Sequence, residues 1–158
     1  MKIIPIKQRD ASACAPTCIE MALTYFAVPH TVKDIATLTD YKQDGVSNNG
    51  LAAALKHYGL KTKVHKNTSW ETLQEENTPD KVLIVSWMLD GYIGHVSVVE
   101  KVTDTHITLA EPTTGTHLKI EKIKFLRLWW DFEAQDRDIW YPETKADVQL
   151  RWLVAVSK

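Results

Sequence analysis

Two cysteines lie four residues apart near the start of the chain, at Cys14 and Cys18. Pro16 fits the first turn of a helix, where a missing N–H costs little, so we expect a helix to begin near Cys14. Helical spacing makes the two thiols parallel neighbours, which are poorly aimed for a disulfide. The free N–H groups and partial positive charge of a helix N-terminus favour a thiolate. Cys14 is therefore a candidate nucleophile, and Cys18, on the apolar stripe, is expected in the core.

A thiolate nucleophile needs a base, and His95 stands out among the six histidines. It follows Gly94 and opens an apolar strand, so we expect the ring at the rim of a buried strand, a common place for a catalytic group. His30, His57 and His65 fall in polar or charged segments and are expected at the surface.

A catalytic imidazole is usually oriented by a group that accepts its other N–H. Strands over 95–102 and 106–110 predict a hairpin in which Ser97 stands opposite Glu111. His95 is then the diagonal neighbour of Glu111 on the same face. This pairing depends on an odd loop length, because a loop of two residues would place the two side chains on opposite faces.

A tetrahedral oxyanion needs hydrogen-bond donors. The backbone N–H of Cys14 offers one, and the side-chain amide of Gln8, six residues upstream, offers another. Each candidate also has an ordinary structural role. Cys14 could be a small buried hydrophobe and His95 a ring bonded to a loop. Glu111 could be a turn residue before a proline and Gln8 an exposed side chain.

The composition bounds the class of protein. The chain has 158 residues, of which 44% are hydrophobic and 25% charged, which excludes a disordered or low-complexity chain. Its net charge of −1 gives no positive excess for nucleic acid. No apolar run approaches the ~18 residues of a membrane span, and the first residues do not resemble a secretory signal. We therefore expect a cytoplasmic protein with reduced cysteines.

The elements that must position these residues change character along the chain. Apolar residues at helical spacing predict three helices in the first 60 residues, over 14–26, 31–38 and 48–58. Further on, the patterns predict strands at 60–65, 82–87, 95–102, 106–110, 117–120 and 150–156, with short helices at 69–75 and 121–130. The stretch 131–147 has no readable pattern. The fold class is α+β, a single domain over 1–158 with a helical half packed on an antiparallel sheet.

Three segments together resemble a known family. Residues 8–21 read Gln-Arg-Asp-Ala-Ser-Ala-Cys-Ala-Pro-Thr-Cys-Ile-Glu-Met and resemble the nucleophile motif of the bacteriocin-processing, papain-like cysteine peptidases. Residues 94–99 resemble the histidine strand of that family, and 110–115 resemble its Asp-Pro…Gly turn. The resemblance runs from about residue 6 to 130. It leaves 131–158 as an unassigned C-terminal extension that ends in a strand.

The resemblance implies a papain-like fold that cleaves peptides after a Gly-Gly leader through an acyl-enzyme. By position, Cys14 would be the nucleophile and His95 the base. Gln8 would be an oxyanion-hole donor, and Glu111 would orient the imidazole, where the family mostly has Asp. Ala15 replaces the Gly that usually follows the nucleophile. The resemblance implies no metal and no other cofactor.

The implied partner is a peptide or protein substrate, such as a precursor peptide with a Gly-Gly leader. The family usually forms the N-terminal domain of an ABC transporter, and no transporter sequence follows here, so we expect a standalone domain and a separate transporter. The same triad would also suit a papain-like deamidase or acyl transferase.

Two alternatives from other classes stay open. One is a non-catalytic peptide-binding module of the same fold, which would capture a peptide without cutting it. The other is a metal site, although structural zinc is usually bound by more thiolates than this chain offers. Its ligands would be Cys14, Cys18, His95 and Glu111.

Overall fold

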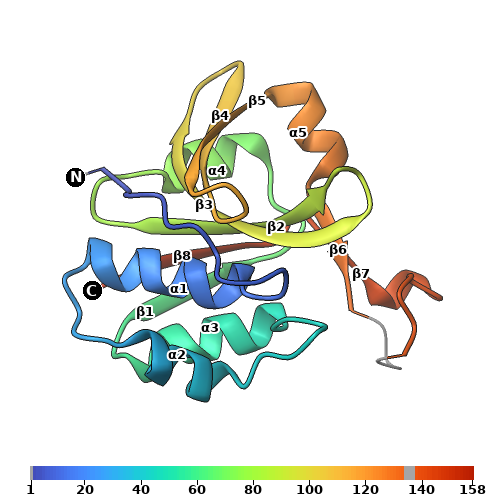
Figure 1. The fold of residues 1–158 in the computed structure, drawn as a ribbon. Coiled ribbons are helices and arrows are strands. Elements are labelled where there is room, and N and C mark those ends of the chain that lie inside the picture. Colours follow the sequence, from blue (N-terminus) through green and yellow to red (C-terminus); the bar gives the residue numbers. More distant parts are fainter. Residues whose placement is uncertain (1, 134–137) are drawn as a thin grey trace.

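A six-stranded antiparallel sheet forms the centre of the computed structural model, which describes residues 2–133 and 138–158 (Figure 1). The strands lie in the order β1-β8-β2-β3-β4-β5. Their bounds are β1 Lys61–His65, β2 Val82–Leu89, β3 Ile93–Val102, β4 His106–Glu111, β5 Thr116–Glu121 and β8 Leu153–Ser157. The last strand of the chain therefore lies inside the sheet, between β1 and β2.

Helices cover both faces of this sheet. Figure 1 shows α1, α2 and α3 below the sheet and α4 and α5 above it. Their bounds are α1 Cys14–Tyr25, α2 Val32–Thr39, α3 Asn48–His57, α4 Trp70–Glu76 and α5 Lys122–Leu128. The expected α+β class, with its N-terminal helical half packed on an antiparallel sheet, is confirmed. None of the helices in the described ranges is long and apolar enough to cross a membrane.

Local sequence explains most helix ends. Thr31, Ser47 and Ser69 are N-caps of α2, α3 and α4, and each side chain accepts from a backbone N–H three residues further on. Just beyond the C-terminus of α3, Gly59 has φ +81°, the left-handed conformation that a glycine adopts at no steric cost.

Each face of the sheet has its own core, and β2 contributes to both. Val82 and Ile84 pack with α1–α3, whereas Leu83, Val85 and Trp87 pack with α4 and α5. Because both faces are covered, β2 is apolar at every position except Ser86 instead of alternating. Its neighbour β3 also contributes to both cores, through Val96 and Val98 on one face and Val99 on the other.

The C-terminal part differs from its predicted elements. The stretch over 131–147 that carried no pattern begins within a two-stranded ribbon, in which β6 (Trp130–Phe132) pairs with β7 (Val148–Leu150). The expected terminal strand over 150–156 is interrupted, because Arg151 has φ +49° and turns the chain between β7 and β8. Residues 130–133 and 138–150 are called the C-terminal arm below.

Candidate active site

Helix α1 begins at Cys14, as the sequence predicted. Its N-cap residue is Ala13, which has no side-chain acceptor for the amides of the first turn. The preceding loop is held by Asp10, whose carboxylate accepts from Ser12 N at 2.9 Å and from the Tyr41 hydroxyl at 2.8 Å. The thiol thus lies at an uncapped helix N-terminus, whose partial positive charge favours an anion.

Cys18 has a different environment, one turn further along α1. It is fully buried, and its Sγ donates to Val96 O at 3.5 Å. Burial, followed by the nearby Cys14 and Glu111, raises the pKa of the Cys18 thiol well above its ordinary value of 9.0. Both cysteines are free. The expectation that Cys18 is a core thiol is confirmed.

His95 is buried on β3, where its ring meets two partners. Nε2 donates to Glu111 Oε1 at 2.6 Å, and Cys14 lines the same cleft as the imidazole and helps to raise its pKa. On the far side of the carboxylate, Ser97 Oγ donates to Glu111 Oε2 at 2.6 Å and accepts from Trp87 Nε1 at 3.0 Å. Since Glu111 occupies Nε2, Nδ1 is the nitrogen left for the thiol.

The strands of the β3–β4 hairpin end and begin where the sequence predicted, with residues 103–105 between them, but their register differs from the predicted one. Val102 pairs with Ile107 and not with His106, which shifts the pairing by one residue. Continued without interruption, this register would place Glu111 opposite Val98. Glu111 would then lie on the other face of the sheet from His95.

A β-bulge restores the predicted pairing. The register shifts by one residue at Glu100, which leaves that residue without an opposite partner. Beyond the bulge, Val98 pairs with Ala110, and the next position brings Ser97 opposite Glu111. The bulge, and not the turn, therefore brings the carboxylate onto the face of the histidine ring.

The charged forms of His95 and Glu111 stabilise each other. Burial lowers the pKa of His95, but its hydrogen bonds and charge interactions with Cys14 and Glu111 outweigh burial and raise it from 6.5 to about 9. Burial raises the pKa of Glu111, whereas His95, Ser97 and the Thr113 N–H lower it, and its net pKa lies below the ordinary 4.5. The site can therefore hold a proton on His95 beside the thiol at neutral pH, as thiolate chemistry requires.

Backbone contacts hold Gln8 against the β4–β5 turn. Gln8 N donates to Pro112 O at 2.7 Å. The N-terminal segment can pass there because Gly115 has φ +68° and no side chain. A Cβ at Gly115 would lie 2.8 Å from Lys7 Cβ and 3.0 Å from Lys7 N.

The side chain of Gln8 is only partly where an oxyanion donor should be. Nε2 donates to Asp10 O at 2.8 Å, which uses one of its two amide hydrogens. Oε1 is buried and has no hydrogen-bond partner among the described residues. Gln8 is also absent from the described lining of the cleft beside Cys14. The structure thus brings Cys14, His95 and Glu111 together and leaves Gln8 just outside.

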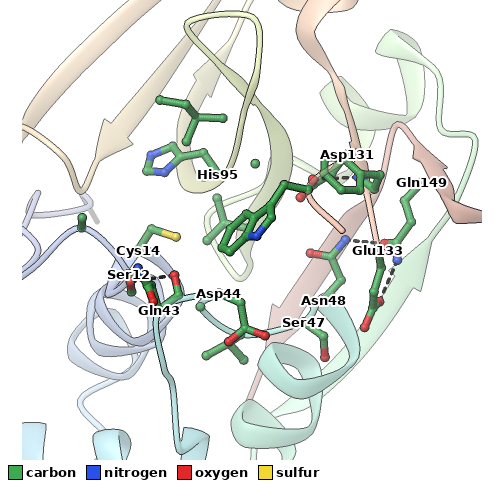
Figure 2. A pocket seen from close by; sticks show the side chains of 18 of the residues that line it. Ser12, Cys14, Gln43, Asp44, Ser47, Asn48, His95, Asp131, Glu133 and Gln149 are labelled. Carbon is green, nitrogen blue, oxygen red and sulfur yellow. Dashed lines mark hydrogen bonds between the residues drawn. The ribbon is translucent and has the colours of Figure 1, made fainter. Parts of the chain in front are cut away.

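A cleft of about 540 Å³ opens beside Cys14 and His95. Figure 2 shows these two side chains at one end and Asp131, Glu133 and Gln149 at the other. The loop that precedes α3, the β2–β3 turn and the C-terminal arm supply its walls. A peptide could therefore lie along the cleft and reach the thiol.

The C-terminal arm is tied to α3 across this cleft. Asn48 Nδ2 donates to Gln149 Oε1 at 2.5 Å, and Gln149 Nε2 donates to Glu133 Oε2 at 3.1 Å. Glu133 N in turn donates to Asp147 O at 2.9 Å. These bonds fix the arm as a wall of the cleft.

Asp131 joins the arm to the histidine strand. Its Oδ2 accepts from Ser86 Oγ at 2.7 Å, and a Cβ at Gly94 would lie only 2.8 Å from its Oδ1. Burial raises the pKa of Asp131 to about 6, although hydrogen bonds from Ser86 and the Phe132 N–H oppose the shift. The glycine before His95 is what allows this carboxyl to lie against β3.

The contribution of the arm was missed by sequence reasoning. The one signal in that stretch was the pair Trp140-Tyr141, two large aromatic residues in a polar segment. The metal alternative gains no support, because no three His, Cys, Asp or Glu side chains in the described part of the chain are grouped to hold an ion.

Comparisons with known proteins agree with this arrangement. The family model described as Peptidase C39 family matches residues 2–132. No curated protein sequence matches. Solved structures resemble the chain over nearly its whole length, and at these low identities they show the fold alone, which is the papain-like fold that the resemblance implied.

Three of those structures illustrate the likeness. One is a double glycine motif protease from an AMS/PCAT transporter in complex with the leader peptide (19% identity, 98% of this chain and 91% of that chain, TM-score 0.71). Another is the peptidase domain of Streptococcus ComA, a bi-functional ABC transporter of a quorum-sensing pathway (15% identity, 98% of this chain and 98% of that chain, TM-score 0.72). The third is a C39-like peptidase from Bacillus anthracis (13% identity, 100% of this chain and 98% of that chain, TM-score 0.70).

Proposed function

Since this chain belongs to the peptidase C39 family and is a cysteine peptidase, we propose that it cleaves a precursor peptide after a Gly-Gly leader sequence. Cys14 is the nucleophile, His95 the base and Glu111 the residue that positions the imidazole. The observation that carries this proposal is one continuous array. The thiol at the start of α1 lines the same cleft as a buried imidazole whose Nε2 lies 2.6 Å from a buried carboxylate.

The first step forms the acyl-enzyme. The thiolate of Cys14 attacks the carbonyl carbon of the scissile bond, and the carbonyl oxygen becomes an oxyanion. The backbone N–H of Cys14 donates to that oxyanion, and Gln8, whose side chain lies outside the cleft lining, would have to turn toward Cys14 to add its remaining amide hydrogen. The His95 imidazolium gives its proton to the leaving amine, the C–N bond breaks, and the downstream peptide departs.

The second step hydrolyses the thioester. His95, now neutral, removes a proton from a water molecule, which attacks the acyl carbon. The C–S bond breaks and the upstream fragment leaves with a new carboxylate, while the thiolate and imidazolium are restored. Throughout, Glu111 accepts from Nε2 and stabilises the cationic ring, and Ser97 holds the carboxylate in place.

The proposed function includes two partners, a peptide substrate and a transporter, and a cellular compartment. The substrate is a peptide with small residues at the cleaved bond, and the second partner is a transporter that exports the product. A structural neighbour that cuts at a double glycine motif supports the substrate class. The free cysteines suit the reducing cytoplasm, where Cys14 would stay a thiol.

A panel of synthetic peptides tests the function. Peptides that differ only in a central Gly-Gly, Ala-Ala or Leu-Leu pair are incubated with the wild type and with Cys14→Ala, and the products are weighed by mass spectrometry. We expect cleavage after the second glycine by the wild type alone. A peptide ending in a Gly-Gly vinyl sulfone should label Cys14 covalently.

The same panel separates the other functions. A deamidase would convert a side-chain amide to an acid with the peptide bond intact, and a transferase would join the acyl group to an added amine. A peptide-binding module would bind the peptides without any covalent change. Any of these results, with no cleavage, would overturn the proposal.

A further inference from the structure

The end of the cleft away from Cys14 is built by the C-terminal arm. Trp140 and Glu133 line it from the arm, and Tyr92 lines it from the turn between β2 and β3. Much of this wall follows residue 132, where the family match ends. The chemistry of this end is therefore a property of this chain's own sequence.

Exposed aromatic rings flank this end from two directions. Tyr92 is 76% exposed and Trp140 is 65% exposed, although each lines the cavity that also contains Cys14. Large apolar side chains at such exposure leave their ring faces open to a bound molecule. An indole face also attracts cations, by about 0.5–2 kcal/mol according to its desolvation.

The charge at this end has one sign. The described residues that line the cleft include the carboxylates of Asp44, Asp131 and Glu133, and none of them is a lysine or an arginine. Asp131 is engaged by Ser86 and the Phe132 N–H, and Glu133 by Gln149. The carboxylates of Asp131 and Glu133 have more acceptor sites than these contacts use, so both can accept further donors.

We propose that this end of the cleft is a subsite for a lysine or arginine side chain of the peptide substrate, with Glu133 as the ion-pair partner and Trp140 as the ring beside it. The cleft is continuous with the Cys14–His95 pair, so its occupant is the peptide that is being cut. This inference rests on the proposed function. It adds the charge of the side chain that the peptide presents near the cleaved bond.

Such a subsite would act on binding and not on the chemical step. Contacts remote from the reacting carbonyl hold substrate and transition state alike, so losing them raises KM and leaves kcat nearly unchanged. Neither Glu133 nor Trp140 belongs to the hydrogen-bonded array of His95 and Glu111. Iodoacetamide alkylation of Cys14 should therefore be unaltered in variants of either residue.

Binding to the Cys14→Ala protein tests the subsite without turnover. The probes are dye-labelled peptides with a central Gly-Gly in which one lysine, or the uncharged isostere norleucine, is moved through each flanking position. We expect one position at which lysine binds about 5- to 20-fold more tightly than norleucine, the combined effect of an ion pair and a ring contact. Glutamate at that position should bind more weakly than either.

Matched variants assign the preference to its residues. Glu133→Gln keeps an acceptor for Gln149 but removes the charge, and Trp140→Ala removes the ring. Each should bring the lysine-to-norleucine ratio toward one. Exposed Tyr141 and Glu71, neither among the lining residues, supply Tyr141→Ala and Glu71→Gln as controls that leave the ratio unchanged.

The outcomes are distinguishable. A ratio near one at every position overturns the subsite, as does a lysine preference that survives both Glu133→Gln and Trp140→Ala. In either case the peptides still bind and the proposed function stands. Failure of every Gly-Gly peptide to bind would instead overturn the proposed function, and the subsite with it.

Discussion

Replacing Glu111 by Gln isolates the charge of the carboxylate from its hydrogen bonds. Glu111 Oε1 accepts from His95 Nε2 at 2.6 Å and from Thr113 N at 2.9 Å, and a Gln carbonyl at that position can accept from both. The amide NH₂ then faces Ser97 Oγ, which can accept from it. The ring keeps an acceptor for Nε2, while the variant loses the negative charge and the acceptor of the Ser97 hydroxyl hydrogen.

The size of the effect follows from the shifted pKa of His95. A rise from 6.5 to about 9 corresponds to about 3 kcal/mol in favour of the imidazolium. Cys14 and Glu111 produce this rise against the opposing effect of burial. Cys14 is the larger cause of this rise and Glu111 the second, so loss of the Glu111 charge lowers the pKa of His95 and should slow thiolate alkylation at pH 7 by about 10-fold or more.

Alkylation by iodoacetamide measures the thiolate directly and needs no substrate. Intact mass gives the rate of single-adduct formation between about pH 5 and 10, a range that spans the histidine and cysteine titrations. We expect the Glu111→Gln profile to move to higher pH by about one to two units. Glu100→Gln, on the bulge of the same hairpin, is the control and should follow the wild-type profile.

Two results would refute this reasoning. Superimposable profiles for the wild type and Glu111→Gln would mean that the carboxylate does not stabilise the imidazolium. An equal slowing in Glu100→Gln would show that the effect reflects general charge or altered folding. Thermal unfolding of both variants, followed by near-UV circular dichroism, checks that the fold is retained.

Three further outcomes are expected. Brief iodoacetamide treatment of the native protein should give one adduct on Cys14 and none in Cys14→Ser, because Cys18 is buried and its pKa is raised; an adduct on Cys18 would contradict the assignment. Lysine hydrogen bonds, against burial, lower the pKa of Glu76 from 4.5 to about 2, so this residue stabilises the fold above pH 4.5 and the gain is lost as pH falls toward 2. Chemical denaturation should therefore show Glu76→Gln less stable by about 2–3 kcal/mol at pH 7 and a smaller difference at pH 3; a constant difference would reject the ion-pair explanation. Gly115→Ala should lower the stability of the fold more than Gly91→Ala, because both glycines have positive φ but only a Cβ at Gly115 would meet the backbone of Lys7. We expect a loss of about 1 kcal/mol from the positive φ alone, in Gly91→Ala, and a larger loss in Gly115→Ala, where the clash is added. Equal melting temperatures of the two variants would refute the close approach.

Sequence patterns located Cys14 and His95 because their signals are local. A proline in the first turn placed the start of a helix at Cys14, and apolar residues at helical spacing placed α2 and α3. The apolar strand after Gly94 placed His95 beside a core. Such signals depend on a few neighbouring residues, so the sequence reports them directly.

The pairing of His95 with Glu111 shows how a local argument can be right for the wrong reason. The sequence argument assumed an unbroken register from the three-residue connection to Glu111, whereas the structure pairs Val102 with Ile107 and compensates with a bulge at Glu100. The position of a bulge depends on the packing and twist of both strands, and the residues around Glu100 carry no sequence signal that predicts one. The face on which Glu111 lies was therefore decided by tertiary structure.

The sequence by itself determined the fold class, the helical half, the start of a helix at Cys14 and the place of His95 on a buried strand. Only the tertiary structure decided that β8 lies inside the sheet, that the C-terminal arm walls the cleft and that Asp131 packs over Gly94. These features depend on contacts between segments far apart in the chain. Periodicity and capping describe each segment alone, whereas strand order and the shape of a cleft are set by which segments pack together.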